Sequence, residues 1–257
     1  MIRGTSEESG ILGSLLLTAG TALIKAGAGT SRIVTNLTRI AIAYGYETHL
    51  EISTRNLSVT LYKEHSEYFS GSRSLVSLPG VNFKVISAIS QLSWEVSETK
   101  PELSALEKEI NDDVYFQEYN RIIVLIVVGL AGGSFCYTFG GRGVEMIISF
   151  IATVLGLFLR QEMDQRKFNP YIVTYCSAVF ASLIIGIAYK IGMDTALDHA
   201  FATSVLFLIP GVPLINSFSD LIDGQTLYGI ERGTTAFMHT LAIASGLSTI
   251  LIMHKLY

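Results

Sequence analysis

The residues best suited to chemistry surround an interruption in one long apolar stretch. Residues 204–224 read SVLFLIPGVPLINSFSDLIDG, with Pro210, Gly211 and Pro213 close together in the middle. Each proline removes a helical hydrogen bond and crowds the preceding turn. At membrane depth the freed backbone groups must be covered by protein or line a watery cavity, where a helix N-terminus can bind an anion. The stretch therefore predicts either a substrate-lining break or a simple proline kink.

Polar side chains follow this interruption at helical spacing. Asn216, Asp220 and Asp223 fall on one face of a helix that continues beyond the prolines. Charged groups at membrane depth are expensive and usually functional, so Asn216 and Asp220 are candidate site residues, whereas Asp223 is expected at a solvated helix end. Arg232 begins the next apolar run, where it either pairs with an aspartate or, as we prefer, anchors the helix at the membrane interface.

A glycine-rich segment near the N-terminus offers a second candidate site. Gly27-Ala28-Gly29 precedes Thr30, Ser31 and Arg32, and the threonine or the serine can cap the following helix. The free N–H groups at the start of that helix could cradle an anion, with Gly27 and Arg32 as the candidate residues. Glycine before a capping residue is also common where one helix ends and the next begins, and this is the simpler interpretation.

Motifs of the common catalytic and metal sites are missing from the sequence. It contains no GxSxG, Walker A, HExxH or GxGxxG pattern, and neither His49 nor His65 has a cysteine or histidine at ligand spacing. Cys136 and Cys176 lie in apolar runs, and residues 1–118 contain no cluster of Lys and Arg. We therefore expect no enzymatic activity, no cofactor, no metal site, no disulfide framework and no nucleic-acid partner.

The uneven distribution of charge divides the chain into two parts. Only 16% of its residues are charged, and 24 of the 40 charged residues precede position 119; about 25% is ordinary for a soluble protein. We expect a membrane protein with a soluble α+β N-terminal domain at 1–118 and an all-α transmembrane domain at 119–257. A spanning helix needs about 20 apolar residues. Five stretches are expected to span, the second being short: 120–141, 144–159, 169–190, 198–219 and 233–255.

Apolar periodicity in the N-terminal part predicts two helices, an antiparallel sheet and two more helices. The helices are expected at 9–26, 31–44, 81–97 and from Thr99 onward, and the strands at 49–54, 56–62 and near 72–78. This order is typical of an α+β layer. The single tryptophan, Trp94, is expected to pack under the sheet.

Basic residues predict which side of the membrane each end faces. The N-terminal segment MIRGTSEESG is polar and shows no export signal, so we expect the N-terminal domain in the cytoplasm. With five spans, five basic residues face inside and three face outside: Arg121, Arg160, Arg166, Lys167 and Arg232 against Arg142, Lys190 and Lys255. This excess agrees with the positive-inside rule.

Short motifs along the whole chain combine into a recognisable pattern. They are Phe139-Gly140-Gly141, Arg160-Gln161-Glu162, Phe168-Asn169-Pro170, Pro210-Gly211, Pro213-Leu214-Ile215-Asn216, Asp220 and Arg232, with Gly27 and Arg32 in the N-terminal part. The pattern resembles the threonine/serine exporter (ThrE) superfamily, and most closely its YjjP-like branch. The resemblance implies a multi-pass exporter of the bacterial inner membrane with a cytoplasmic N-terminal domain. It also implies an oligomeric assembly with a smaller YjjB-like membrane subunit, and a small-molecule substrate such as succinate, threonine or serine.

We therefore predict a secondary exporter subunit for small carboxylate-bearing metabolites, working by alternating access. Arg160 would hold a carboxylate near the cytoplasmic mouth, because a guanidinium binds a carboxylate through two parallel hydrogen bonds. The alternative for Arg160 is a positive-inside anchor. The residues predicted to bind substrate are Arg160, Gln161, Asn169, Pro210, Gly211, Pro213, Asn216, Asp220 and Arg232. A second hypothesis is a membrane-anchored sensing or regulatory subunit that binds its ligand at the loop 27–32.

Overall fold

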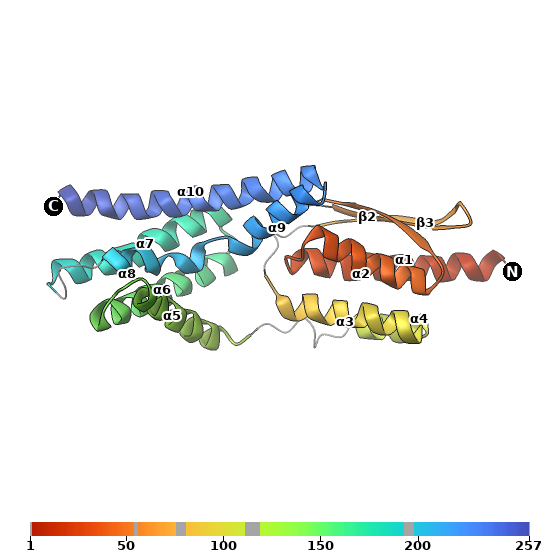
Figure 1. Cartoon of the computed structure of the whole chain (residues 1–257), viewed down its shortest axis with the longest axis horizontal. Coiled ribbons are helices and arrows are strands. Elements are labelled where there is room, and N and C mark those ends of the chain that lie inside the picture. The colour runs from red at the N-terminus through yellow and green to blue at the C-terminus, as the bar shows by residue number, and fades with distance from the viewer. Residues whose placement is uncertain (1, 54–55, 76–80, 111–118, 193–197, 257) are drawn as a thin grey trace. The chain divides into compact units, whose positions relative to one another are not determined.

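The chain is mostly helical, with one small sheet near its N-terminus (Figure 1). The computed structural model describes residues 2–53, 56–75, 81–110, 119–192 and 198–256. Contacts within the chain divide it into two compact units, which are described separately.

Unit 1 comprises Met1–Gln117 and Val212–Gly233, and unit 2 comprises Glu118–Gly211 and Thr234–Tyr257. Residues 212–233, which the charge pattern assigned to the transmembrane part, therefore belong to the same compact unit as the N-terminal part. The predicted division at residue 118 concerns which residues meet the membrane, and it stays a prediction.

Unit 1 follows the predicted order of two helices, strands and two helices. Its elements are α1 (Ile2–Lys25), α2 (Thr30–Ala43), β1 (Glu47–Ile52), β2 (Asn56–Lys63), β3 (Ser66–Ser74), α3 (Phe83–Thr99) and α4 (Leu103–Ile110). Helix α9 (Gly211–Ile222) and the first turns of α10 (Thr226–Leu256) complete the unit.

The third strand begins earlier than the sequence predicted. We expected it near 72–78, but β3 starts at Ser66, directly after a two-residue turn at Glu64 and His65; positions 76–78 lie outside the described residues. Both turn residues have positive φ, 50° and 63°. Turns of this kind usually contain glycine or asparagine, so the Glu-His pair gave no hairpin signal.

The sheet supplies one apolar face for the helices to cover. β2 is the central strand and pairs antiparallel with both β1 and β3. Along β2, Leu57, Val59 and Leu61 are fully buried, whereas the residues between them are partly exposed. This alternation follows from the two-residue period of side chains in a strand.

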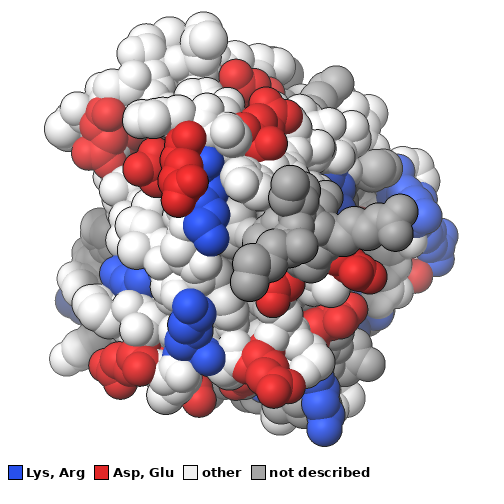
Figure 2. Space-filling view, turned by 90° about the vertical axis from the view of Figure 1, so that its right-hand side faces the viewer, with Lys and Arg blue, Asp and Glu red and all other residues white. Residues whose placement is uncertain are grey.

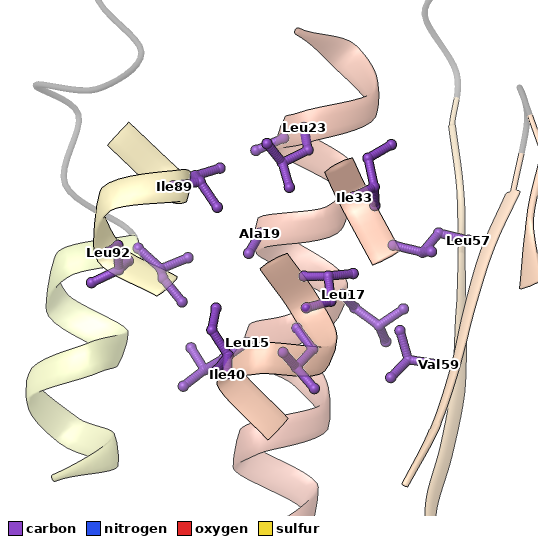
Figure 3. Packing of buried hydrophobic residues seen from close by; sticks show 14 of the residues in the cluster. Leu15, Leu17, Ala19, Leu23, Ile33, Ile40, Leu57, Val59, Ile89 and Leu92 are labelled. Carbon is purple, nitrogen blue, oxygen red and sulfur yellow. The ribbon is translucent and has the colours of Figure 1, made fainter. Parts of the chain in front are cut away.

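Helix α1 forms the centre of the unit 1 core. Leu57 and Val59 approach α1 from the sheet, and Ile89 and Leu92 of α3 approach it from the other side (Figure 3). Burying one such leucine or isoleucine side chain contributes about 1.5–3 kcal/mol. The core therefore fixes the positions of the loops at the ends of α1, α2 and α3.

Trp94 does not pack under the sheet, and that prediction was wrong. Helix α3 buries a stripe that contains Val85, Ile86, Ile89, Leu92, Ser93 and Val96. Trp94 lies outside this stripe and is 58% exposed. Its ring is covered on one face by the guanidinium of Arg39, 3.8 Å from the ring centre.

Unit 2 is built from apolar helices. They are α5 (Arg121–Thr138), α6 (Gly143–Gln165), α7 (Pro170–Lys190), α8 (Asp198–Ser204), a 3-10 helix (Leu206–Leu208) and the remainder of α10. Among the described residues, four helices are long and apolar enough to cross a membrane. The count is five if Asp198–Leu208 and Gly211–Ile222 form one interrupted span.

Helix α6 is longer than the predicted stretch 144–159. It continues to Gln165 because its polar last turns pair along the helix, Arg160 with Asp164 and Glu162 with Arg166, at i,i+4 spacing. The second span, the shortest by sequence, therefore has membrane-crossing length.

The predicted interruption within the fourth apolar stretch is present in the backbone. The 3-10 helix ends at Leu208, Ile209 and Pro210 are not helical, and α9 starts at Gly211. Pro213 falls in the first turn of α9, where its missing N–H leaves no helical hydrogen bond unmade.

The two units differ in the surfaces they present. Acidic and basic side chains are interspersed over the face that carries the β2–β3 hairpin (Figure 2). In unit 2 the outer faces of the helices are apolar; only 22% of α5 is buried, and Ile122, Ile126 and Leu130 are exposed. Exposed apolar rows of this extent are typical of helices that face lipid.

Candidate functional site

The loop between α1 and α2 brings two backbone carbonyls to one place. The chain reverses after α1 at Gly27, whose φ of +75° is a conformation that glycine adopts without strain. The N–H groups of Gly27 and Ala28 bond back to the carbonyls of Ile24 and Leu23, which closes the C-terminus of α1. The carbonyls of Gly27 and Ala28 accept hydrogen bonds from elsewhere in the unit.

The turn between α9 and α10 is built in the same way. Gly224 has a φ of +80°, and the N–H groups of Gly224 and Gln225 bond back to the carbonyls of Leu221 and Asp220. The hydroxyl of Ser217 donates to the carbonyl of Gly229 over 2.7 Å and ties α9 to α10. The two helices therefore hold Asp220 and Arg232 opposite each other.

Asp220 and Arg232 form a buried ion pair. Arg232 Nη1 lies 3.3 Å from Asp220 Oδ2, and the two side chains are only 6% and 1% exposed. Within the described residues, neither of these two atoms makes a hydrogen bond, so the contact between them is ionic. The guanidinium also donates through Nη2 to the carbonyl of Ala28 (2.6 Å) and to the hydroxyl of Tyr228 (2.8 Å).

The other carboxylate oxygen of Asp220 serves the start of α2. Asp220 Oδ1 accepts a hydrogen bond from the N–H of Thr30 over 3.1 Å. The residue before it, Gly29, offers no side chain to cap the helix. A carboxylate at a helix N-terminus satisfies a free N–H and opposes the positive end of the helix dipole. Asp220 is thus a cap supplied from a distant part of the sequence.

Three predicted site residues, Asn216, Asp220 and Arg232, meet here with Tyr228 and the backbone of 27–30, and we name this group the anchor cluster. Asn216 joins it by donating from Nδ2 to the carbonyl of Gly27 over 2.8 Å. Arg232 pairs with Asp220 inside the unit, which is the alternative of pairing with an aspartate and not the preferred one of an anchor at the membrane interface. Burial of two charges is costly unless further hydrogen bonds satisfy them, and the loop carbonyl and Tyr228 provide these.

An open groove of about 830 Å³ lies beside the anchor cluster. Its walls are α2 with the loop before it, α3, and the polar face of α9. Polar side chains dominate this lining and include Arg32, Asn36, Arg39, Gln91, Asn216 and Asp223. The groove can therefore receive a small charged molecule.

Arg39 is held in a fixed position at this groove. Its Nη1 donates to Ser93 Oγ (2.8 Å) and to Asn36 Oδ1 (3.4 Å), and its guanidinium stacks on Trp94. Asn36 and Ser93 are themselves buried and hydrogen-bonded to each other. By contrast, Arg32 is exposed and has no ionic partner among the residues that the structure describes.

Most of the remaining predicted site residues belong to unit 2, and Pro213 at the start of α9 belongs to unit 1. Arg160 donates from Nη1 to the carbonyl of Phe207 (3.4 Å) and lies 3.7 Å from Asp164. Gln161 accepts from Arg121 Nε (2.7 Å). Asn169 caps α7, since its side-chain oxygen accepts from the N–H of Tyr171 (3.0 Å). Each of these side chains has a partner within its own unit.

Sequence reasoning missed several functional candidates. Arg39 lies seven residues after Arg32 on α2, and this spacing alone places both on one helix face. No motif or spacing in the sequence marked three further residues of this region: Asn36, Trp94 and Tyr228. Glu145, buried in unit 2 with its carboxylate 3.2 Å from His199 Nδ1, also went unremarked because it starts an otherwise apolar run.

Comparison with known proteins covers nearly the whole chain. The family model ThrE ("Putative threonine/serine exporter") matches residues 14–254. A "Probable succinate transporter subunit YjjP" of Escherichia coli (strain K12) is 26% identical and covers 94% of each chain. A protein of the same name from Klebsiella aerogenes is 26% identical over 87% of this chain and 86% of its own.

A more distant relative is longer. The "Threonine/serine exporter" of Corynebacterium glutamicum is 22% identical over 94% of this chain but only 50% of its own length. No solved structure gives a significant match. The match of the family model to residues 14–254 shows that this chain belongs to the threonine/serine exporter (ThrE) family.

Proposed function

We propose that the chain is one subunit of a secondary exporter that moves small carboxylate-bearing metabolites out of a bacterial cell. It belongs to a transporter family, and several of its helices have membrane-crossing length. The single observation that carries the proposal is the family match from residue 14 to residue 254, which spans both units. Succinate, threonine and serine are the substrates to test, because these names describe its relatives.

The proposal includes a topology and a partner. Five spans in the inner membrane, the fourth interrupted between α8 and α9, would leave residues 1–118 in the cytoplasm, with α9 at the cytoplasmic end of its span where it packs within unit 1. Two relatives are named as subunits, which implies a partner subunit. We propose a smaller YjjB-like membrane protein as that partner, with alternating access across the pair.

The predicted site residues divide into two proposed roles. Arg160, Gln161 and Asn169, together with the break at 210–213, would line the route of the carboxylate. Half-exposed guanidiniums suit this role because they can exchange a protein partner for a ligand. Asn216, Asp220 and Arg232 would act on the route indirectly, by holding the segment that follows the break in one arrangement.

Export from proteoliposomes tests this function. Vesicles containing the chain, its partner or both are loaded with labelled succinate, threonine or serine, and efflux is measured. Both proteins together should release at least one of these compounds faster than protein-free vesicles. If no compound leaves faster under any imposed ion or substrate gradient, carboxylate export is wrong.

A matched pair of variants tests the proposed role of Arg160. Arg160→Gln should slow efflux strongly, because the carboxylate loses its guanidinium partner. Arg166→Gln is the control, since Arg166 ends the same helix and pairs only with Glu162 among the described residues. If both variants slowed efflux equally, Arg160 would contribute only positive charge and would not bind the carboxylate specifically.

The alternative function is a membrane-anchored sensing subunit. The groove favours it, because unit 1 alone can offer a polar binding surface outside the apolar helices. A sensor would bind ligand in unit 1 and show no efflux in the vesicle assay with any partner. An exporter would show efflux in the vesicle assay, whether or not unit 1 binds the ligand.

A further inference from the structure

We propose that the groove between α2, α3 and α9 of unit 1 is a recognition site for a small carboxylate. The proposal rests on the proposed export function for the choice of ligands to test, but not for the site itself. The volume of about 830 Å³ exceeds what a four-carbon metabolite needs. It lies within the usual range for small-molecule sites, about 300–1,000 Å³.

Two arginines on one wall provide the carboxylate partners. Arg32 and Arg39 are two helical turns apart on α2, about 10 Å along the axis, and both line the groove. Arg39 is already oriented by Ser93 and by its stacking on Trp94. A guanidinium that is fixed before binding loses little entropy when it engages a carboxylate.

Arg32 provides the guanidinium that is available to bind the ligand. Its side chain is exposed, and among the described residues it has neither an ionic nor a hydrogen-bond partner. Most other arginines of the described chain have an acceptor, as Arg39, Arg121 and Arg232 do. A free guanidinium beside an ordered one suits a ligand with two acceptor groups.

The opposite wall provides the means to discriminate between ligands. Asn216, Ser219 and Asp223 face the groove from α9, and the exposed carboxylate of Asp223 has no partner in the part of the chain described. Asp223 would bind the ammonium group of an amino acid and would repel the second carboxylate of a dicarboxylate. The same groove thus gives different expectations for threonine and succinate.

Binding in the groove would act on the segment that follows the helix break. Helix α9 starts at Gly211, directly after Pro210, and its polar face is one wall of the groove. A ligand bridging Arg32 and α9 would reinforce the hold of the anchor cluster on residues 212–233. Recognition in unit 1 would thereby bias the arrangement of the broken helix.

Trp94 makes the site measurable in the intact protein. It is the only tryptophan of the chain, and it lies on the groove under Arg39. The full-length chain in detergent is titrated with succinate, L-threonine and threoninol at constant ionic strength, following Trp94 emission and, in parallel, heat. Saturable binding of at least one carboxylate is expected, and threoninol, which lacks the carboxylate, should not bind.

Variants assign the binding to the groove. Arg32→Gln, which leaves the Arg39–Trp94 stack intact, should weaken binding of either carboxylate about ten-fold, the usual effect of losing one charge-assisted hydrogen bond. Asp223→Asn should weaken threonine binding and strengthen succinate binding. Arg73→Gln is the matched control, an exposed arginine of unit 1 on β3, and should change neither.

Three outcomes would overturn the proposal: neither carboxylate binding by emission or heat, threoninol binding equally well, or Arg73→Gln weakening binding as much as Arg32→Gln. Failure of the export function is a separate result. If Trp94 reports carboxylate binding while vesicles show no efflux, the groove stands and export fails. If efflux occurs and the titration is flat, export stands and the groove fails.

Discussion

The anchor cluster of unit 1 and the charged end of α6 in unit 2 use arginine in opposite ways. Arg232 is almost fully buried, and its partners are one buried carboxylate, a backbone carbonyl and a tyrosine hydroxyl. Arg121 and Arg160 remain 33% and 35% exposed and pair with carboxylates that solvent also reaches. A buried pair cannot separate without stranding a charge, whereas a half-exposed pair exchanges partners at little cost. The buried pair is suited to holding two segments of the chain together, and the half-exposed pairs are suited to binding a ligand.

The largest effect should come from removing one member of the buried pair. Arg232→Met leaves the carboxylate of Asp220 buried without its counter-charge, which lowers the free energy of unfolding by about 3–5 kcal/mol. Denaturant unfolding followed by Trp94 emission reports on unit 1 directly.

A double variant separates lost charge from lost packing. Asp220→Leu with Arg232→Met removes both charges and should recover most of the stability, because hydrophobic replacement of a buried pair is often neutral. Arg121→Met in unit 2 is the control and should have a much smaller effect; its unfolding is followed by circular dichroism of the whole chain, because Trp94 lies in unit 1. If Arg121→Met is as damaging as Arg232→Met, the contrast between the two regions is wrong.

A somewhat smaller effect should come from the helix packing of unit 2. The Cβ of a larger residue at Gly132 would overlap the side chain of Thr153 on α6. Gly132→Val should therefore destabilise unit 2 by about 1–3 kcal/mol through overpacking. Gly143→Ala is the control, since no atom of the described chain lies within 4 Å of the added Cβ. Thermal unfolding of the two full-length variants in the same detergent measures the difference.

A third prediction concerns the half-exposed ion pairs of unit 2. Glu162 pairs with both Arg121 and Arg166. Glu162→Gln should lower the free energy of unfolding by about 1 kcal/mol or less, and the loss should shrink in high salt. The effect of Arg232→Met should persist in high salt, because buried charges are screened far less. If the loss of stability caused by Glu162→Gln did not change with salt, the ion pairs of Glu162 would be held as rigidly as the anchor cluster.

The smallest effect should be an alkaline one, confined to unit 1. Burial raises the pKa of Tyr44, whose hydroxyl donates to the carbonyl of Pro101 over 2.6 Å. A raised folded-state pKa gives stability that is complete below the unfolded value, about 10, and is lost as pH rises through the folded value. Tyr44→Phe should therefore lose less stability above about pH 10 than the wild type, measured by unfolding across that range. The exposed Tyr119→Phe serves as control and should follow the wild type.

Much of the fold was accessible from the sequence because the signals were local. Apolar runs without charge marked the long helices, and the alternation of residues 56–62 marked the central strand. Pro210 marked the helix break, since a proline in a helix interior removes a hydrogen bond and clashes with the preceding turn. Misses occurred where local signals were weak, as at the Glu64–His65 turn, or where a helix face was judged wrongly, as for Trp94.

The candidate site was only partly predictable for a different reason. Sequence spacing placed Asn216, Asp220 and Asp223 on one helix face, but it gave no partner for any of them. In the structure the first two turn to the α1–α2 loop, whereas Asp223 faces the groove. Helical period fixes directions within one element, and only the packing of elements decides which direction meets which neighbour.

The sequence by itself determined that this chain has a charged N-terminal part, several membrane-length helices and one interrupted helix. These properties depend on composition and on the geometry of proline, which act over a few residues. Only the tertiary structure decided that Asp220 caps a helix 190 positions earlier and that Arg232 reaches a carbonyl 204 positions away. Such contacts are set by the burial of the unit 1 core, which positions loops without regard to their distance along the chain.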